Sequence, residues 1–573
     1  MVNLTIDKKS VSVPEGTTIL EAAREIGVNI PTLCYLKEIN EISACRICTV
    51  EVAGSKTLVA SCTTPVQESM EVYTASQRVL EARATNLSLI LSEHNTNCTF
   101  CERSGNCTLQ TLAQPYDLRG VPYQQTPDKN NWDPKYPLIR DGSRCIKCMR
   151  CVAVCEKIQT MRVWDVSGTG ARTKVAVRDG LDLMEANCAL CGQCITHCPV
   201  GALSARADSN ELIHAMGAKP DKIFVCQVAP AVRSAWGEDL GVPKELATVG
   251  RMVAALRAIG FDYVFDTDFS ADLTIMEEGN EFLERLGHKE DYRWPMFTSC
   301  CPGWVRFVKT EFPEYIPNLS TAKSPQQKFG AVAKSYFAEK LGVDPEHIVC
   351  VSFMPCTAKK YECAVEAVND AASRDVDLVL TTRELSKLIR RYRIDVTALP
   401  EENFDDPLGE STGAGVIFGT TGGVMEAALR SAYYLAVGEN PDVDAFQAVR
   451  GMDGIKEAVF DIKGTKVRTA VANGLGNARK LMESIKAGQA EYDFVEIMAC
   501  PTGCAGGGGQ PIRDAQELGE ARGEILRELD REKSIRFSHE NASIQRLYEE
   551  YLEKPLSHRA HKLLHTDISA WEL

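Results

Sequence analysis

The spacing of the cysteines constrains this chain more than any other feature of its sequence. Fifteen of the 23 cysteines lie in the first 200 of 573 residues, and eight are spread over the rest. The N-terminus shows no apolar run behind a basic stretch and no twin arginine, so we expect a cytoplasmic protein, in which thiols stay reduced. Disulfides then cannot account for so many cysteines. The N-terminal third is therefore predicted to bind metal.

Charge and hydropathy argue against two other classes of protein. Asp and Glu outnumber Lys and Arg by 78 to 64, which gives a net charge of −14. Such an acidic chain is not expected to bind nucleic acid, and it favours a basic or locally basic partner. No apolar segment reaches the length of about 18 residues that a membrane-spanning helix needs, so we expect no membrane insertion.

The first group of cysteines follows a predicted β-hairpin, over residues 2–6 and 11–13, and a helix. Thr18 and Glu21 form the pattern of a capping box at the start of that helix. Gaps of ten, two and thirteen residues then separate Cys34, Cys45, Cys48 and Cys62. The group resembles the ligand loop of a plant-type [2Fe-2S] ferredoxin with a β-grasp fold, although its spacing is closer to the N-terminal ferredoxin domains of large respiratory and hydrogenase subunits. We predict this domain over residues 1–78, with a zinc site as the alternative.

A second ligand pattern follows a predicted helix over residues 76–93. His94 precedes three closely spaced cysteines, which are Cys98, Cys101 and Cys107. A histidine in register with three cysteines is a typical ligand set, and it suits zinc as well as an iron-sulfur cluster. The neighbouring iron-sulfur patterns favour a [4Fe-4S] cluster, in a small domain over residues 79–125.

Two further runs share the spacing Cys-x₂-Cys-x₂-Cys-x₃-Cys, which is typical of bacterial two-cluster ferredoxins. They predict a domain with two [4Fe-4S] clusters over residues 126–208. In that fold the fourth cysteine of each run ligates the other cluster. The resemblance therefore assigns one cluster to Cys145, Cys148, Cys151 and Cys198. It assigns the other cluster to Cys188, Cys191, Cys194 and Cys155.

From about Ser209 onward, β-rich runs alternate with amphipathic helices, which predicts a two-lobed α/β domain over residues 209–573. The expected strands are residues 223–228, 264–266, 348–353, 376–380 and 467–472. The chain as a whole is thus predicted to be multidomain, with α+β and α/β parts. We expect helices over residues 542–564, and His558, His561 and His565 share helical spacing at the end of this segment. These histidines are interpreted as a packed or solvated helix face rather than a metal site.

Three segments of the large domain combine cysteine with glycine or proline: residues 298–304, 354–360 and 498–511. They resemble the active-site signatures of the iron-only, or [FeFe], hydrogenases, and the order of the cluster motifs resembles the clostridial-type enzyme along essentially the whole chain. The resemblance implies an H-cluster: a [4Fe-4S] cubane, bridged by Cys504 to a two-iron subsite with CO, cyanide and a dithiolate bridge. The implied cubane ligands are Cys301, Cys356, Cys500 and Cys504.

The resemblance also implies the surroundings of the two-iron subsite. The Lys359 ammonium would point at a cyanide ligand. The other implied pocket residues are Ala229, Pro230, Ser324, Met354 and Met498. Glycines at 506–509 would let the backbone approach a bulky inorganic group. Thr502 departs from the family's Cys-x-Gly-Gly-Cys, and a β-branched residue is expected to disfavour positive φ there and to add bulk near the cluster.

Cleavage of H₂ into a proton and a hydride needs a base near the metal and a route for the proton. Cys300 adjoins Cys301, and a free thiol has a pKa of about 8.5. A stripe of charged residues on the predicted helix 276–285 is typically a solvated, salt-bridged face. The resemblance instead implies a proton path formed by Cys300, Glu278, Ser320, Glu281 and Arg285.

The sequence therefore predicts a cytoplasmic [FeFe] hydrogenase that exchanges electrons with ferredoxin through one [2Fe-2S] and three accessory [4Fe-4S] clusters. A close alternative is the catalytic subunit of an NAD(P)-linked or electron-bifurcating complex with flavin- and NAD(P)-binding partner subunits. An alternative of another class is a non-catalytic hydrogen sensor or iron-sulfur assembly relative, which Cys300 and the complete third motif disfavour. Maturation proteins are expected to supply the two-iron subsite.

Two glycine-rich segments and three cysteines are not assigned to a metal site. The glycine-rich residues 419–423 and 506–509 lack the companion residues of phosphate or dinucleotide loops, so we expect no bound nucleotide. Three cysteines have no ligand role and are predicted to be small buried apolar residues: Cys226, Cys350 and Cys363.

Overall fold

The computed structural model describes residues 1–118, 120, 122–128, 132–219, 221–451, 454–514 and 516–572. The chain forms two compact units. The first unit comprises Met1–Ile158, Arg162–Asp182 and Cys194–Ser204. The second comprises Gln159–Met161, Leu183–Gln193 and Ala205–Leu573. Leu573, the last residue of the predicted catalytic domain, lies outside the described residues.

The N-terminal part of the first unit is a five-stranded sheet with the order β2-β1-β5-β3-β4, in which β1 is antiparallel to β2 and parallel to β5. The strands are β1 Val2–Ile6, β2 Lys9–Val13, β3 Thr49–Val52, β4 Val59–Ala60 and β5 Glu71–Tyr73. Alternate side chains of β1 and β2 are buried in one core with helix α1, Ile19–Glu25. This is the predicted β-grasp arrangement.

The cap of α1 differs in one detail from the sequence pattern. Thr18 Oγ1 accepts a hydrogen bond from Glu21 N at 3.3 Å, as expected. The Glu21 carboxylate, however, accepts hydrogen bonds from Arg24 at 2.8 Å and from the Tyr35 hydroxyl at 2.7 Å. The carboxylate therefore ties the helix to the cysteine loop instead of completing a capping box.

The rest of the first unit consists of short elements joined by the cysteine loops. Helix α2, Gln77–Glu93, begins at the N-cap Ser76, close to the predicted helix. It is followed by α3 Thr108–Ala113, α4 Arg150–Ala153 and the antiparallel hairpin β7 Trp164–Ser167 with β8 Lys174–Val177.

The second unit contains two four-stranded sheets, with the orders β11-β10-β13-β14 and β12-β17-β16-β15. The first sheet is parallel throughout, and in the second only β15 runs antiparallel to its neighbour. The strands are β10 Ile223–Val228, β11 Tyr263–Asp266, β12 Met296–Phe297, β13 Ile348–Met354, β14 Leu378–Thr381, β15 Ile455–Ile462, β16 Thr465–Asn473 and β17 Phe494–Met498. Each of the five predicted strands is present, so the two-lobed α/β prediction is confirmed.

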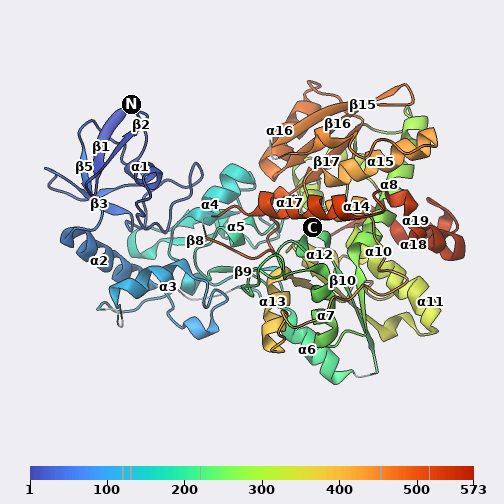
Figure 1. The fold of residues 1–573 in the computed structure, drawn as a ribbon, viewed down its shortest axis with the longest axis horizontal. Helices are drawn as coiled ribbons and strands as arrows, with labels where there is room; N and C mark the ends of the chain where they lie inside the picture. The colour runs from blue at the N-terminus through green and yellow to red at the C-terminus, as the bar shows by residue number, and fades with distance from the viewer. Residues whose placement is uncertain are drawn as a thin grey trace. The chain divides into compact units, whose positions relative to one another are not determined.

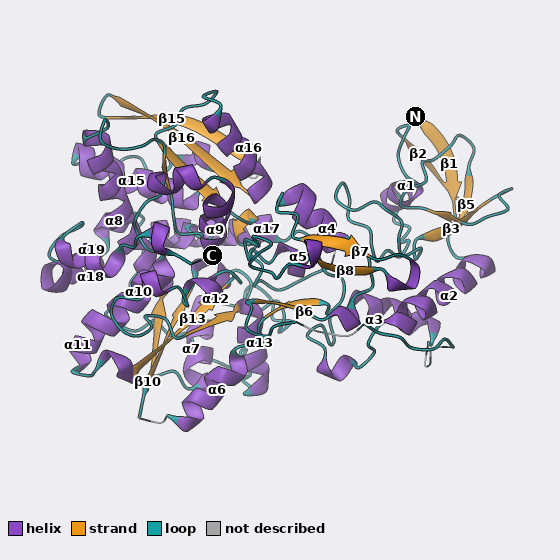
Figure 2. Cartoon of the chain, turned by 180° about the vertical axis from the view of Figure 1, so that it is seen from behind, coloured by secondary structure: helices purple, strands orange, loops and turns teal. Residues whose placement is uncertain are grey.

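Helices of the second unit lie between its two sheets. Figure 1 shows β15, β16 and β17 on one side of α14 and α17 and β10 on the other, and Figure 2 shows the same separation from behind. The central helices are α8 Thr267–Gly287, α10 Pro325–Val332, α14 Gly413–Ile417, α15 Gly423–Val437 and α17 Gly519–Glu532. Among them, α8 packs against α10, α14 and α15.

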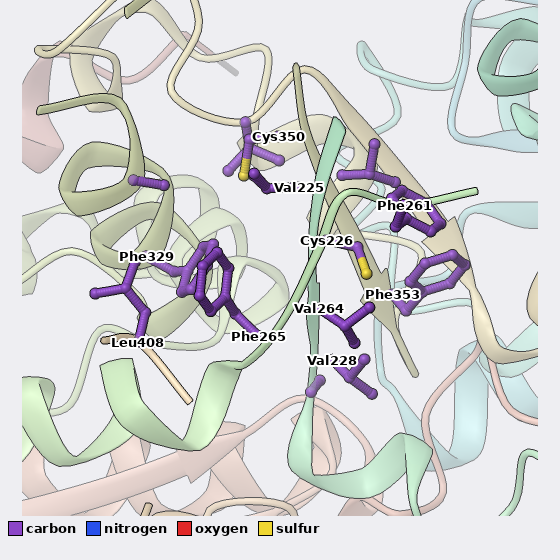
Figure 3. Packing of buried hydrophobic residues seen from close by; sticks show 14 of the residues in the cluster. Val225, Cys226, Val228, Phe261, Val264, Phe265, Phe329, Cys350, Phe353 and Leu408 are labelled. Atoms are coloured by element: carbon purple, nitrogen blue, oxygen red, sulfur yellow. The ribbon is translucent and has the colours of Figure 1, made fainter. Parts of the chain in front are cut away.

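The strands of the first sheet of the second unit contribute to a large apolar core (Figure 3). Cys226 on β10 and Cys350 on β13 are fully buried in it. They project from opposite faces of the sheet, because Cys350 is paired with Val225, and successive side chains along β10 point to opposite faces. Cys363 belongs to the same core. All three therefore behave as the small buried apolar residues that the sequence predicts.

The C-terminal tail is helical but interrupted. It comprises α18 Ala542–Leu547, the π-helical turn η14 Tyr548–Leu552 and α19 His558–Leu564. A search of the described residues finds no helix with the length and apolar character to cross a membrane.

Candidate active site and cluster sites

The three cysteine motifs of the second unit begin where parallel strands end. Cys301 follows β12 and precedes helix α9, Pro302–Glu311. Cys356 comes two residues after β13, and Cys500 two residues after β17. Carboxyl ends of parallel strands are the usual binding edge of α/β sheets. β13 belongs to one sheet and β17 to the other, so the two lobes supply thiols to one place.

One cavity of the second unit brings together predicted site residues from all three cysteine motifs, although Cys500 is not in its wall. Its wall includes the thiol-bearing residues Cys300, Cys301, Cys356 and Cys504 and the amine of Lys359. Four of the five predicted pocket residues also line it: Ala229, Pro230, Met354 and Met498. Other residues of the wall were not singled out from the sequence, among them Thr267, Gln326 and Phe418.

The four predicted cubane ligands act electrostatically on one another. Burial raises the pKa of Cys356 to about 12, and the Cys301 thiolate adds to this rise. The pKa of Cys500 is raised well above its usual range, mainly by burial. The negative charge of neighbouring thiolates adds to this rise, from Cys356, Cys191, Cys301 and Cys504. Such crowding is unfavourable for free thiolates, whereas coordination to iron deprotonates thiols outright. The donor set therefore fits a multi-iron cluster, and among the described residues no three Cys, His, Asp or Glu side chains meet at the site of a single ion.

The glycines after Cys504 allow close contacts between loops. A Cβ at Gly507 would lie 2.2 Å from Pro355 O, and one at Gly508 would lie 2.6 Å from Cys191 O. These glycines thus let three backbone segments of the cysteine loops pack against one another. A direct approach of this backbone to the inorganic group remains a prediction beside this contact between loops.

Thr502 shows neither the strain nor the bulk at the cavity that the sequence suggested. It is not among the residues with positive φ, which at this turn is adopted by Gly503 at +68°. Its side chain occupies the space that Gly506 and Gly519 leave free, since a Cβ at either would lie 1.9 Å from Thr502 Oγ1. Thr502 is not part of the cavity wall described above.

Lys359 is held at the cavity by a carboxylate. Its Nζ donates to Glu362 Oε2 at 2.8 Å and to Cys300 O at 3.0 Å. Burial lowers the pKa of Lys359, but Glu362 more than compensates and raises the pKa overall, so the amine is an ammonium. Ser324, predicted as a pocket residue, is not in the cavity wall and instead donates to Glu362 Oε2 at 2.9 Å. Sequence reasoning missed Glu362, although its i, i+3 spacing from Lys359 on the helix Lys359–Glu362 is a local signal.

The predicted proton path forms a buried chain rather than a solvated face. Ser320 Oγ donates to Glu281 Oε2 at 2.7 Å, and Arg285 Nη2 donates to Glu281 Oε1 at 2.5 Å. Glu278 is 1% exposed, and Ser320 also bonds to its carboxyl. Helix α8 buries this stripe because it packs against α10 and α15 on both sides. The chain thus runs from the cavity toward Arg285.

Burial changes the protonation of this chain. It raises the pKa of Glu278 to about 7, although the Lys328 ammonium opposes the rise. Burial and the Glu278 carboxylate raise the pKa of Cys300 well above that of a free thiol. Cys300 is therefore a thiol at neutral pH, whereas the sequence analysis assumed a pKa near 8.5. Glu278, not Cys300, titrates near neutrality.

In the first unit, the cysteines of the β-grasp domain come together in two contacts. Cys48 Sγ and Cys62 Sγ lie 3.3 Å apart, and the neighbouring Cys45 thiol lowers the pKa of Cys34 to about 6. Cys34, Cys48 and Cys62 are buried. The mutual effects on their pKa values link all four thiols, as a shared cluster requires.

His94 ends helix α2 and is suited to metal ligation. Its ring is 6% exposed, and no described residue is hydrogen-bonded to its Nδ1. Burial lowers its pKa, which keeps the imidazole neutral, as a ligand must be. Burial raises the pKa of Cys107, and the neighbouring Cys101 thiolate adds to this rise. Cys98 begins the short helical turn Cys98–Phe100.

The two ferredoxin-like runs cross as the resemblance implies, at least for one set. A cavity in the first unit is lined by Cys145, Cys148, Cys151 and Cys198, so the last cysteine of the second run joins the first run. The other set is distributed over the two units. Cys155 and Cys194 belong to the first unit, and Cys188 and Cys191 to the second.

One link between loops of the second unit was not visible in the sequence. Gln159 Nε2 donates to Cys191 Sγ at 3.3 Å and to Ala499 O at 2.8 Å, next to Cys500. Its Oε1 accepts from Leu475 N at 2.9 Å. The Gln159 amide thus connects a predicted accessory ligand to the loop of the active-site motif.

Comparison with known proteins identifies the family. The model of the iron-only hydrogenase large subunit, C-terminal domain, matches residues 222–508. The sequence is also 50% identical to the NADP-reducing hydrogenase subunit HndD of Solidesulfovibrio fructosivorans, over 99% of this chain and 98% of that protein. The chain belongs to the iron-only hydrogenase family. This hydrogenase is 39% identical to Iron hydrogenase 1 of Clostridium pasteurianum, with 99% of both proteins covered.

A solved structure and further family models extend this result. An apo form of the [FeFe]-hydrogenase HydA1 from Chlamydomonas reinhardtii is 45% identical, with a TM-score of 0.56, and covers 62% of this hydrogenase and 98% of that chain. A 2Fe-2S cluster binding domain matches residues 1–77, the NADH-ubiquinone oxidoreductase-G iron-sulfur binding region 83–122, a 4Fe-4S dicluster domain 144–202 and the iron hydrogenase small subunit 516–569. The predicted iron-sulfur domains are thus present, and the small-subunit segment at the C-terminus was not foreseen.

Proposed function

We propose that this hydrogenase catalyses 2H⁺ + 2e⁻ ⇌ H₂ at an H-cluster held by four thiolates. The proposed ligands are Cys301, Cys356, Cys500 and Cys504. The observation that carries the proposal is the buried cavity whose wall combines thiols from three strand-end loops with the Lys359 ammonium. A set of crowded thiols, of which Cys500 is buried and the other three are half-buried, suits an anionic iron-sulfur group beside the Lys359 ammonium.

When bound, the H-cluster would supply the redox chemistry that forms or splits H₂. Around it, the apolar side chains of Met354, Met498 and Phe418 exclude water from the cavity. Lys359 lines the cavity, and its ammonium, held by Glu362, would place a positive charge beside an anionic group there. Removing either partner would leave a buried charge without compensation.

The protein's own residues handle the proton. Cys300 holds a proton at Sγ beside the cavity, and Glu278 exchanges it because the pKa of Glu278 is about 7. The Ser320 hydroxyl bonds to both Glu278 and Glu281 and carries the proton between them. Arg285 keeps Glu281 oriented through its 2.5 Å hydrogen bond.

The accessory clusters are proposed to be one [2Fe-2S] and three [4Fe-4S] clusters. The [2Fe-2S] ligands are Cys34, Cys45, Cys48 and Cys62. His94, Cys98, Cys101 and Cys107 would hold the second cluster, and the crossed ferredoxin-like sets the other two. The unpartnered Nδ1 of buried His94 and the cavity lined by Cys145, Cys148, Cys151 and Cys198 support these assignments.

The electron partner is proposed to be an NAD(P)-linked set of flavin-binding subunits or, as the alternative, ferredoxin. Identity of 50% along 99% of the chain to an NADP-reducing hydrogenase subunit favours the complex. Cytoplasmic location and assembly by maturation proteins are part of the same proposal. Purification from the native host tests it, because diaphorase subunits should co-elute if the complex exists.

The H-cluster itself is tested by infrared spectroscopy of protein co-expressed with maturation proteins. Metal-bound CO and CN bands should appear, and Cys504→Ser should abolish them. Cys300→Ala should keep the bands but lose turnover, by at least roughly 10²-fold. Cys363→Ala is a control, since Cys363 lies in the apolar core and both bands and turnover should persist. A matured protein without such bands would refute the H-cluster, and full turnover in Cys300→Ala would refute the role of Cys300.

A further inference from the structure

A glycine-rich turn at residues 419–422 lies between α14 and α15 and has no assigned role in the proposals above. Gly419 and Phe418, which precedes the turn, line the active-site cavity. At the end of the turn, Gly422 adopts a φ of +79°, and a Cβ there would lie 2.4 Å from Val449 O. Residue 422 must therefore be glycine, which has no side chain with which to cap α15.

This turn contacts both neighbours of Cys504. On one side, Ala505 N donates a hydrogen bond to Gly419 O at 2.9 Å. On the other side, Gly503 packs so closely against the turn that a Cβ there would lie 2.7 Å from Thr421 N. The position of Cys504 between these two contacts therefore depends on where the turn lies.

Glu496 anchors the turn to the second sheet. Its Oε1 accepts a hydrogen bond from Gly422 N at 2.8 Å, and its Oε2 accepts one from Met425 N at 2.7 Å. These donors belong to the start of α15, where backbone N–H groups have no partner within the helix. Glu496 lies on β17, which pairs with β12 on one side and with β16 on the other. The turn is thus fastened to a strand in the interior of the sheet.

Capping of α15 does not by itself explain a carboxylate at this place. Glu496 is fully buried, and among the described residues no Lys or Arg forms an ion pair with it. Burial raises its pKa to about 7, although the N–H groups of Met425 and Gly422 oppose the rise. Such a buried anion is costly. Its two acceptor oxygens, however, hold two N–H groups at once and so fix the turn relative to the sheet.

We propose that Glu496 is a positioning residue for Cys504 and acts through the 419–422 turn, an inference that rests on the proposed H-cluster. β17 carries Glu496 and leads directly to Cys500, which comes two residues after the strand. Cys500 is therefore placed by the chain itself. Cys504 is placed by the turn that Glu496 holds. One strand thus sets the spacing between two of the four proposed cubane ligands.

The first test uses the full chain without clusters. Glu496→Gln keeps the size of the side chain, but its NH₂ group cannot accept a hydrogen bond from an N–H. We expect hydrogen–deuterium exchange of the Ala505 amide to become faster by roughly tenfold or more, because the turn that accepts its hydrogen bond is released. A role limited to capping α15 would accelerate exchange at Gly422 and Met425 but not at Ala505.

Glu410→Gln is the matched control, because Glu410 Oε2 accepts from Ser543 N at 2.9 Å at the start of another helix, α18. It should leave exchange at Ala505 unchanged. Glu496→Asp keeps the charge but is shorter by one methylene group, so it cannot reach both donors and should also accelerate exchange at Ala505. This variant provides the test if Glu496→Gln does not fold. Wild-type exchange at Ala505 in Glu496→Gln, or in Glu496→Asp, would overturn the proposal.

A second measurement examines the matured protein. The CO and CN infrared bands of Glu496→Gln should shift or broaden, since Cys504 no longer lies in one fixed position, whereas the bands of Glu410→Gln should match those of the wild type. Unchanged bands in a Glu496→Gln variant with accelerated exchange at Ala505 would show that the turn does not position the ligand, and would also overturn the proposal. Absence of the bands from the matured wild-type protein would instead refute the H-cluster.

Discussion

Lys328→Met should shift the pH dependence of H₂ oxidation and also stabilise the protein. Lys328 lies on α10, is fully buried, and none of the described residues accepts a hydrogen bond from its Nζ. Burial lowers its pKa to about 8, while Glu277, Glu278 and Glu281 oppose this fall. At pH 7 it is therefore a buried cation whose main partners are the carboxylates of Glu277, Glu278 and Glu281.

The expected change in rate follows from Glu278. Its pKa is about 7 with Lys328 present. Loss of a neighbouring cation raises a carboxyl pKa by ~1 unit or more. At pH 7 the ionised fraction of Glu278 then falls from about one half to about one tenth. Because Glu278 is the proposed proton acceptor in H₂ oxidation, the rate should fall about fivefold at pH 7 and recover about 1 pH unit higher.

The expected change in stability follows from Lys328 itself. A folded-state pKa of about 8 against 10.5 for the free amine means that folding disfavours the charged form. The cost is about 3 kcal/mol below pH 8 and fades to zero as the pH rises to 10.5, because the amine is neutral in the folded state throughout that range. Lys328→Met should remove this cost, so the gain in stability is largest at neutral pH and disappears in alkali.

The assay is H₂ oxidation with an artificial electron acceptor from pH 6 to 9, together with unfolding midpoints over the same range. Lys328→Arg keeps the charge and should keep the wild-type profile. Lys334→Met is the control for stability, because Lys334 is equally buried but paired with Asp377 at 2.8 Å, so its loss should destabilise the protein. An unshifted pH profile in Lys328→Met, or a loss of stability equal to that of Lys334→Met, would contradict the reasoning.

Two further predictions concern electron transfer. His94→Ala should remove or convert one accessory cluster, seen as altered iron content and EPR, while the CO and CN infrared bands persist; an unchanged EPR spectrum would exclude His94 as a ligand. Gln159→Leu should lower the reduction potential of the cluster bound by Cys191 by roughly tens of millivolts, because the donated hydrogen bond stabilises the reduced, more negative cluster. EPR-monitored redox titration measures this shift, and a potential equal to wild type would show that the Gln159 amide has no such effect.

Sequence reasoning performed best where the signal was local. The predicted strand over residues 223–228 coincides with β10, and the hairpin, α1 and α2 lie where alternation and capping residues indicated them. Cysteine motifs with fixed short spacing indicate ligands because neighbouring thiols on one loop can reach one cluster. The same local view misjudged Thr502, since the room for its side chain is made by Gly506 and by Gly519, which is remote in sequence.

The stripe of Glu278, Glu281 and Arg285 shows where local reasoning stops. Its spacing is that of an ordinary exposed helix face, and only the packing of α8 against α10 and α15 makes it a buried chain. The pKa of Glu278 near 7 is a product of that burial. Lys328 and His565 belong to the same network, but they lie about 50 and 290 residues after Glu278 in the sequence. No sequence motif indicates that either residue is near Glu278.

The sequence by itself determined the types of metal site, the order of the domains and the residues that present thiols, because these depend on spacing within single loops. Tertiary structure alone decided which thiols share a cavity, which carboxyls lose contact with water, and where Thr321 and His565 meet Glu281. The physical reason is that desolvation and long-range hydrogen bonds arise only when distant segments pack together.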